Sequence, residues 1–144
     1  MNQPKTVSIL PGQGIGPLRL GMTFDEITEQ IGSYDQRELA NATQLICENI
    51  KIWIDHQTDR VSQILVFGSF EGTFDGWMTL GMTLADAVKK GYSYREELGV
   101  YMLDGVDGMC VELNDDCDLD DDAPWDEQSA AIARISVFLK EESV

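Results

Sequence analysis

The chain is short of basic residues and of histidine, and it has no long apolar run. Its 144 residues include 10 lysines and arginines, one histidine and 26 acids, so the formal net charge is −16. A surface for nucleic acid needs a basic footprint to contact phosphates, and this charge disfavours one. No stretch reaches the roughly 18 apolar residues of a membrane-spanning helix, and residues 1–6 contain no apolar run of signal-peptide length. We therefore expect a cytoplasmic protein with no membrane segment and no direct nucleic-acid partner.

Residues for catalysis or metal binding are equally sparse. Cys47, Cys110 and Cys117 form no C-x-x-C pair and are odd in number, which indicates reduced thiols rather than a disulfide framework or a zinc site. His56, the only histidine, has no serine or cysteine in a recognisable triad and is expected to be a solvated turn residue. The acids lack a recognisable cationic or oxyanion-stabilising partner. We expect no enzymatic activity, no catalytic residues and no cofactor.

What the chain does contain is an internal repeat. The tetrapeptide Leu-Gly-Met-Thr occupies residues 20–23 and returns at residues 80–83, and Gly12 and Gly16 match Gly72 and Gly76 at the same spacing. A fixed spacing of this size indicates one supersecondary unit used twice. Units this small are marginal alone, so we predict a single domain over residues 1–144, with repeat one at 11–68 and repeat two at 72–139.

Each copy of the tetrapeptide predicts the start of a helix. Thr23 can cap the first turn, and Glu26, three residues later, can complete a capping box. Thr83 and Asp86 repeat this arrangement in the second copy. Apolar residues then recur at helical spacing, which predicts one short helix in each repeat.

Strands are predicted to follow each helix. Alternation and β-branched content indicate strands at residues 45–47, 50–55, 61–67, 100–103, 109–113 and 132–138. The segments 33–43 and 92–98 are polar and are interpreted as connectors. The expected fold class is therefore α+β, with two tandem αβββ repeats forming one antiparallel sheet and with the helices packed on one face.

Repeat two contains an acidic insertion inside its last hairpin. Residues 109–113 match 50–54 at an offset of 59, whereas 132–138 match 61–67 at an offset of 71, which leaves twelve extra residues in a loop at 114–129. Between Arg95 and Arg134 there are 13 of the 26 acids and no basic residue. So dense a segment of like charge repels itself, and long loops on rigid scaffolds commonly carry binding residues.

The function expected of this loop is to bind a cationic protein. Negative charge attracts such a partner over a distance, and an aromatic side chain then anchors it. The candidate partner-binding residues of the loop are Asp115, Asp116, Asp118, Asp120, Asp121, Asp122, Trp125, Asp126 and Glu127.

Two alternatives stay open for the same loop. Asp116, Asp118, Asp120 and Glu127 have the spacing of positions 1, 3, 5 and 12 of a calcium loop, but Asp121 stands where the sharp turn needs glycine. A calcium-binding small domain is therefore an alternative function, and no metal ligand is assigned. The second alternative is a solvated loop on a scaffold of some other function.

The motif Gly16-x-x-x-Leu20-Gly21-Met22-Thr23-x-x-Glu26-Ile27, followed by a strand meander, resembles the repeating unit of the BamE/SmpA-like outer-membrane lipoprotein family. Two such helix-plus-meander units in tandem resemble the beta-lactamase inhibitory protein-like fold. The resemblance implies a scaffold whose sheet binds another protein, and it makes Trp53 a further partner-binding residue. Joined to the acidic loop, it implies an inhibitor or immunity protein that neutralises a basic partner such as a bacterial nuclease toxin.

Overall fold

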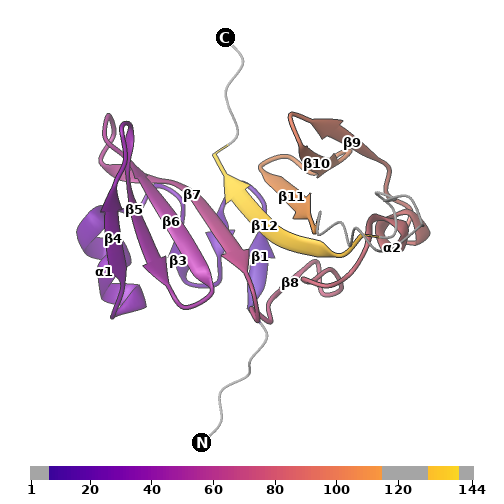
Figure 1. The fold of residues 1–144 in the computed structure, drawn as a ribbon, viewed down its shortest axis with the longest axis horizontal. Helices are drawn as coiled ribbons and strands as arrows, with labels where there is room; N and C mark the ends of the chain where they lie inside the picture. Colours follow the sequence, from indigo (N-terminus) through magenta and orange to yellow (C-terminus); the bar gives the residue numbers. More distant parts are fainter. Residues whose placement is uncertain (1–6, 115–129, 140–144) are drawn as a thin grey trace, which may run out of the picture.

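The computed structural model describes residues 7–114 and 130–139, in which twelve strands form two sheets beside two helices (Figure 1). The larger sheet is antiparallel in the order β4-β5-β6-β7-β12-β11-β10-β9. Its strands are β4 (Asp35–Glu38), β5 (Ala42–Cys47), β6 (Ile50–Asp55), β7 (Arg60–Phe67), β9 (Tyr94–Glu97), β10 (Val100–Leu103), β11 (Met109–Leu113) and β12 (Ile132–Phe138). The smaller sheet, in the order β3-β2-β1-β8, contains β1 (Ser8–Leu10), β2 (Gly14–Ile15), β3 (Leu18–Arg19) and β8 (Thr73–Phe74). The helices are α1 (Phe24–Ile31) and α2 (Leu84–Lys89).

The expected α+β class, with two αβββ repeats in one sheet, is wrong because the described chain is mostly β-structure. Its helices have eight and six residues, and four strands of the larger sheet follow each of them instead of three. The missed strands, β4 and β9, lie at the two edges, where exposed polar side chains give no apolar alternation. The second sheet was missed because its strands have only two or three residues each.

Both helices begin as the sequence predicts. Glu26 N–H donates to Thr23 Oγ1 at 3.2 Å, and Thr23 N–H donates to Glu26 Oε1 at 3.0 Å. Thr83 and Asp86 form the same capping box in α2. A cap contributes about 1 kcal/mol, which matters because helices this short are not stable alone. In the described part of the chain, no helix is both long and apolar enough to cross a membrane.

The same backbone contacts recur in both halves of the chain. In repeat one, the tetrapeptide and β7 exchange two hydrogen bonds, from Gly21 N–H to Val61 O and from Val61 N–H to Met22 O, both at 2.8 Å. In repeat two, the equivalent bonds to β12 run from Gly81 N–H to Ile132 O at 2.9 Å and from Ile132 N–H to Met82 O at 2.7 Å. The repeated tetrapeptide therefore fixes the start of each helix to the start of the last strand of its own half.

The matching hairpins of the two halves differ in the length of their connection. Residues 56–59 join β6 to β7, whereas residues 114–131 join β11 to β12. The bulge between Trp53 and Ile54 recurs between Glu112 and Leu113, which is the offset of 59 found in the sequence. Because β11 pairs with β12 in the same register as β6 pairs with β7, the additional residues of repeat two fall within the β11–β12 connection.

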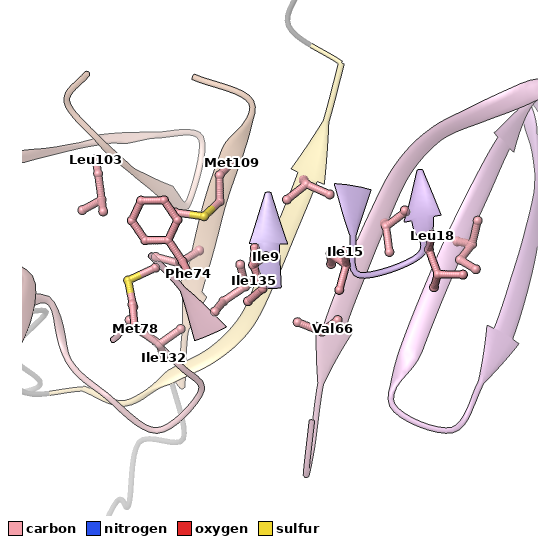
Figure 2. Close-up of a cluster of buried hydrophobic side chains, with 14 of the residues drawn as sticks. Ile9, Ile15, Leu18, Val66, Phe74, Met78, Leu103, Met109, Ile132 and Ile135 are labelled. Carbon is pink, nitrogen blue, oxygen red and sulfur yellow. The ribbon is translucent and has the colours of Figure 1, made fainter. Parts of the chain in front are cut away.

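One face of the larger sheet packs on the hydrophobic core. Directly paired side chains cross five strands on this face, and all are buried: Leu45, Ile52, Ile64, Val137 and Met109. The smaller sheet covers the centre of this face, and Figure 2 shows its Ile9 and Ile15 beside Ile135 of β12 and Val66 of β7. The core is therefore centred on the junction of the two repeats.

Gly108 attaches the β1–β2 turn to repeat two. Gly108 O accepts hydrogen bonds from Gly12 N–H and from Phe138 N–H, both at 3.0 Å. Gly108 has φ +85°, and a Cβ at this position would lie 2.5 Å from the backbone N and Cα of Gly12. Only glycine permits this approach, so Gly108 holds the first strands of the chain against the last.

We predict that Gly108→Ala destabilises the fold far more than Gly105→Ala, which serves as the matched control. Both glycines have φ +85°, but a Cβ at Gly105 meets nothing within 4 Å. The left-handed conformation should cost each variant about 1 kcal/mol, and the clash at Gly108 should add about 1–3 kcal/mol. Denaturant unfolding measures both free energies, and equal losses would show that the Gly12 contact is unimportant.

Candidate partner-binding surface

Most of the predicted partner-binding residues lie outside the described residues. They are Asp115, Asp116, Asp118, Asp120, Asp121, Asp122, Trp125, Asp126 and Glu127. The structure describes how this segment is attached, because Asn114 N–H donates to Ala131 O at 2.7 Å and Leu113 pairs with Ile132. The acidic segment therefore leaves and re-enters the larger sheet at one end of two neighbouring strands.

Trp53, the remaining predicted residue, lies in β6 on the face of the larger sheet opposite to the core. It is half-buried between its cross-strand neighbours, Gln44 of β5 and Gln63 of β7. Gln63 pairs in turn with Phe138 of β12, so a single row of side chains crosses the junction of the repeats. We call this side of the sheet the second face, and its central residues are Gln44, Ile46, Lys51, Trp53, Gln63, Leu65, Phe67, Cys110, Glu112, Arg134, Ser136 and Phe138.

Several polar side chains of the second face contact one another or an aromatic ring. Arg134 Nε donates to Glu112 Oε1 at 3.1 Å, and Gln63 Nε2 donates to Ser136 Oγ at 3.3 Å. Lys51 Nζ lies 5.3 Å from the centroid of the Phe67 ring, within the range of a cation–π contact. Each of these contacts joins neighbouring strands, and the charges of Lys51, Arg134 and Glu112 leave the face without a large excess of either sign.

A hollow of about 390 Å³ lies in repeat two, between the β9–β10 hairpin and the end of β12. It is lined by Arg95, Met102, Val106, Asp107, Gly108, Phe138 and Leu139. The guanidinium of Arg95 is held by Glu97 at 2.8 Å and by Asp104 at 3.0 Å. Phe138 borders both this hollow and the row that contains Trp53, so it connects the hollow to the aromatic residues of the second face.

Sequence reasoning named Trp53 on this face and missed Leu65, Phe67 and Phe138. A signal for them existed in the strand pattern. In β7 the core face is taken by Ile64 and Val66, so the alternate positions, Leu65 and Phe67, point to the other face and should be polar if that face were simply solvated. Apolar residues at both sets of positions indicate a strand with two apolar faces.

The single histidine belongs to a polar cluster at the β4 edge of the sheet. His56 Nε2 lies 3.3 Å from Glu38 Oε1 and 3.2 Å from Thr43 Oγ1. Hydrogen bonds from Gln36, then Thr43, and the nearby His56 lower the pKa of the Glu38 carboxyl. Among the described residues, no group of three or more His, Cys, Asp or Glu side chains could hold a metal ion.

Cys47 and Cys110 are free thiols, and they differ in burial. Cys110 lies on the second face beside Ser136 and is only 8% exposed, whereas Cys47 is half-buried near the end of α1. Burial disfavours the charged thiolate and, with a smaller contribution from Glu112, raises the pKa of Cys110 to about 11. Burial also raises the pKa of Cys47. Neither thiol has the lowered pKa of a catalytic cysteine.

We predict that Cys110 resists alkylation in the folded protein. Because its pKa is about 11, only a small fraction is thiolate at pH 8, and the modification rate should still be rising at pH 10. In the unfolded chain the rate should level off near the ordinary thiol pKa of roughly 8.5. Peptide mass spectrometry after iodoacetamide pulses at several pH values measures both profiles. A folded-state rate for Cys110 equal to the unfolded rate would contradict the buried placement.

A comparison with known proteins gives no match for this chain, whether against protein-family models, curated proteins or solved structures. The resemblance to BamE/SmpA-like units and to the beta-lactamase inhibitory protein-like fold therefore rests on the repeated motif alone and stays a hypothesis.

Proposed function

We propose that this chain is a non-enzymatic protein-binding module, an inhibitor or immunity protein that acts in the cytoplasm and neutralises a basic partner such as a bacterial nuclease toxin. The observation that carries the proposal is the segregation of charge, since 13 of the 26 acids and no base lie between Arg95 and Arg134. Self-repulsion in such a segment opposes folding, and a cationic partner relieves it. A row of carboxylates can also occupy a basic groove that otherwise takes phosphates.

The attachment of the acidic segment supports this function. Its two ends are hydrogen-bonded to each other through Asn114 and Ala131, and they continue into β11 and β12, next to the junction of the repeats. A loop that starts from a rigid sheet has fewer positions to sample than a free tail, so less conformational entropy is lost when a partner binds.

The aromatic residues of the second face also support this function. Trp53, Phe67 and Phe138 are only partly buried there, and aromatic residues are enriched at the centres of protein interfaces. Next to these rings, Gln63 is hydrogen-bonded to Ser136 and Arg134 to Glu112, so these polar groups already have partners within the sheet. The proposed interface thus combines long-range attraction by the acids with apolar contact on the sheet.

We predict that replacing Asp120, Asp121 and Asp122 with Asn lowers the association rate for the basic partner and weakens its salt dependence. Exposed charges are screened within about 8 Å at physiological ionic strength, so the effect should be largest at low salt. Stopped-flow or surface plasmon measurements at several salt concentrations give the rates. The partner is first identified by retention on the immobilised wild-type chain.

The matched control removes three negative charges elsewhere. Glu29, Asp59 and Glu71 are exposed in the first half of the chain, so Glu29→Gln, Asp59→Asn and Glu71→Gln change the net charge equally. If the control triple slows association as much as the loop triple, only net charge matters and the loop is not the binding element.

We predict that Trp53→Ala weakens binding of the same partner roughly tenfold or more, mainly through faster dissociation, because an aromatic anchor is lost while the charge is unchanged. Trp53→Phe should retain much of the affinity, since a ring still occupies the row between Gln44 and Gln63. Melting temperatures check that both variants remain folded. Unchanged dissociation of the Ala variant would exclude the second face from the interface.

A further inference from the structure

The β9–β10 hairpin presents a leucine at its tip. Glu97 pairs with Val100, so Leu98 and Gly99 form a two-residue turn at one edge of the larger sheet, far from β4 in Figure 1. The relative exposure of Leu98 is 104%, whereas other exposed large apolar side chains among the described residues range from 38% for Leu39 to 51% for Leu139. Leu98 therefore presents its whole side chain to the outside.

The backbone at this tip is unfavourable for leucine. Leu98 has φ +52° and Gly99 has φ +86°. Turns with two positive φ angles match the twist of a hairpin, and Asn-Gly or Asp-Gly is the usual sequence because a branched L-residue is strained in the left-handed region. Leu98 thus combines full exposure of an apolar side chain with backbone strain. Such a combination at one residue calls for a function that needs it.

The two strands that flank this turn, β9 and β10, are held together by several contacts. All four residues of β9 pair with β10, and the centroids of the Tyr94 and Tyr101 rings lie 6.0 Å apart. Arg95 bridges Glu97 and Asp104 at 2.8 and 3.0 Å, and its Nη2 donates to Met102 Sδ at 3.5 Å. The position of the tip is therefore defined before any partner arrives, which limits the entropy lost on binding.

The charge around the tip selects the kind of surface that it can meet. Glu96 and Glu97 are exposed next to Leu98, and Asp104 lies at the far end of the same hairpin. These three acids are balanced by only one positive charge, that of Arg95. The hairpin is thus net negative, with an apolar apex. A second copy of this chain, with its charge of −16, would be repelled from it.

We propose that Leu98 is an anchor residue that inserts into an apolar pocket bordered by lysine or arginine side chains on the basic partner. This inference rests on the proposed function and adds a contact outside both the acidic segment and the second face. The pocket takes up the leucine side chain, and the basic rim pairs with Glu96, while Glu97 keeps its ion pair with Arg95. The strain at Leu98 is kept because asparagine, which suits the turn, cannot make the apolar contact.

The test uses Leu98→Asn, which suits the turn but removes the anchor. The variant should melt roughly 1–3 °C higher than the wild type, because a strained turn is relaxed and no buried surface is lost. Its affinity for the basic protein retained by the wild-type chain, identified and purified, should fall roughly 10- to 100-fold in calorimetry at physiological salt. Greater stability together with weaker binding is the signature of an anchor held in a strained turn.

Glu48→Asn is the matched control. Glu48 is exposed at φ +51° in the two-residue turn between β5 and β6, so the substitution also relaxes a left-handed backbone but removes no apolar side chain. It should raise the melting temperature by a similar amount and leave the affinity within about twofold.

Four outcomes would overturn the inference, and they separate it from the proposed function. If Leu98→Asn binds as tightly as the wild type while the Asp120, Asp121 and Asp122 triple binds more weakly, the proposed function stands and Leu98 is no anchor. A lower melting temperature for Leu98→Asn would show that the leucine supports the fold instead. A wild-type dimer that Leu98→Asn dissociates in sedimentation would make a second copy the occupant. If the wild-type chain retains no basic protein, both the inference and the proposed function fail.

Discussion

The antiparallel pairing of β7 with β12 is the interaction on which the rest of the structure depends. It aligns Phe67 with Arg134 and Gln63 with Phe138, and it turns two four-stranded halves into one sheet. On the core side it brings the buried Ile64 and Val66 next to Ile135 and Val137. Separating the halves would break this contact between the buried side chains of β7 and β12, and a unit of half this size buries a smaller fraction of its surface.

The same pairing also determines what lies on the opposite side of the sheet. Successive residues of a strand point to opposite faces, so once Ile64 and Val66 enter the core, Leu65 and Phe67 must emerge on the second face. A solvated antiparallel sheet would carry polar residues there. The chain instead places aromatic rings among paired polar groups, a composition closer to the centre of a protein interface than to ordinary surface.

Negative charge is distributed so that it does not oppose the core. The edge strand β4 is exposed along its whole length and β9 along most of it, and their charged side chains discourage another strand from pairing at either edge. The highest density of acids falls in the connection between β11 and β12. Leu98 is the exception on the β9 edge, an apolar residue among acids.

The sequence alone determined those features that depend on nearby residues. The capping boxes at Thr23 and Thr83 need partners only three residues away, and the alternation in β6, β11 and β12 shows directly in the order of the residues. Composition alone likewise located the acidic segment. The sequence did not reveal β4 and β9, because an exposed edge strand buries neither face and needs no apolar pattern.

Only the tertiary structure decided the features that depend on distant contacts. The strands β1, β2, β3 and β8 are too short for any periodicity and exist because they pair with each other over the junction of the repeats. Phe138 joins Trp53 and Phe67 on one face only because β7 and β12, which are far apart in the sequence, adopt a particular register. The register between β7 and β12 is set by how their core-facing side chains pack together, and this packing involves residues from both halves of the chain.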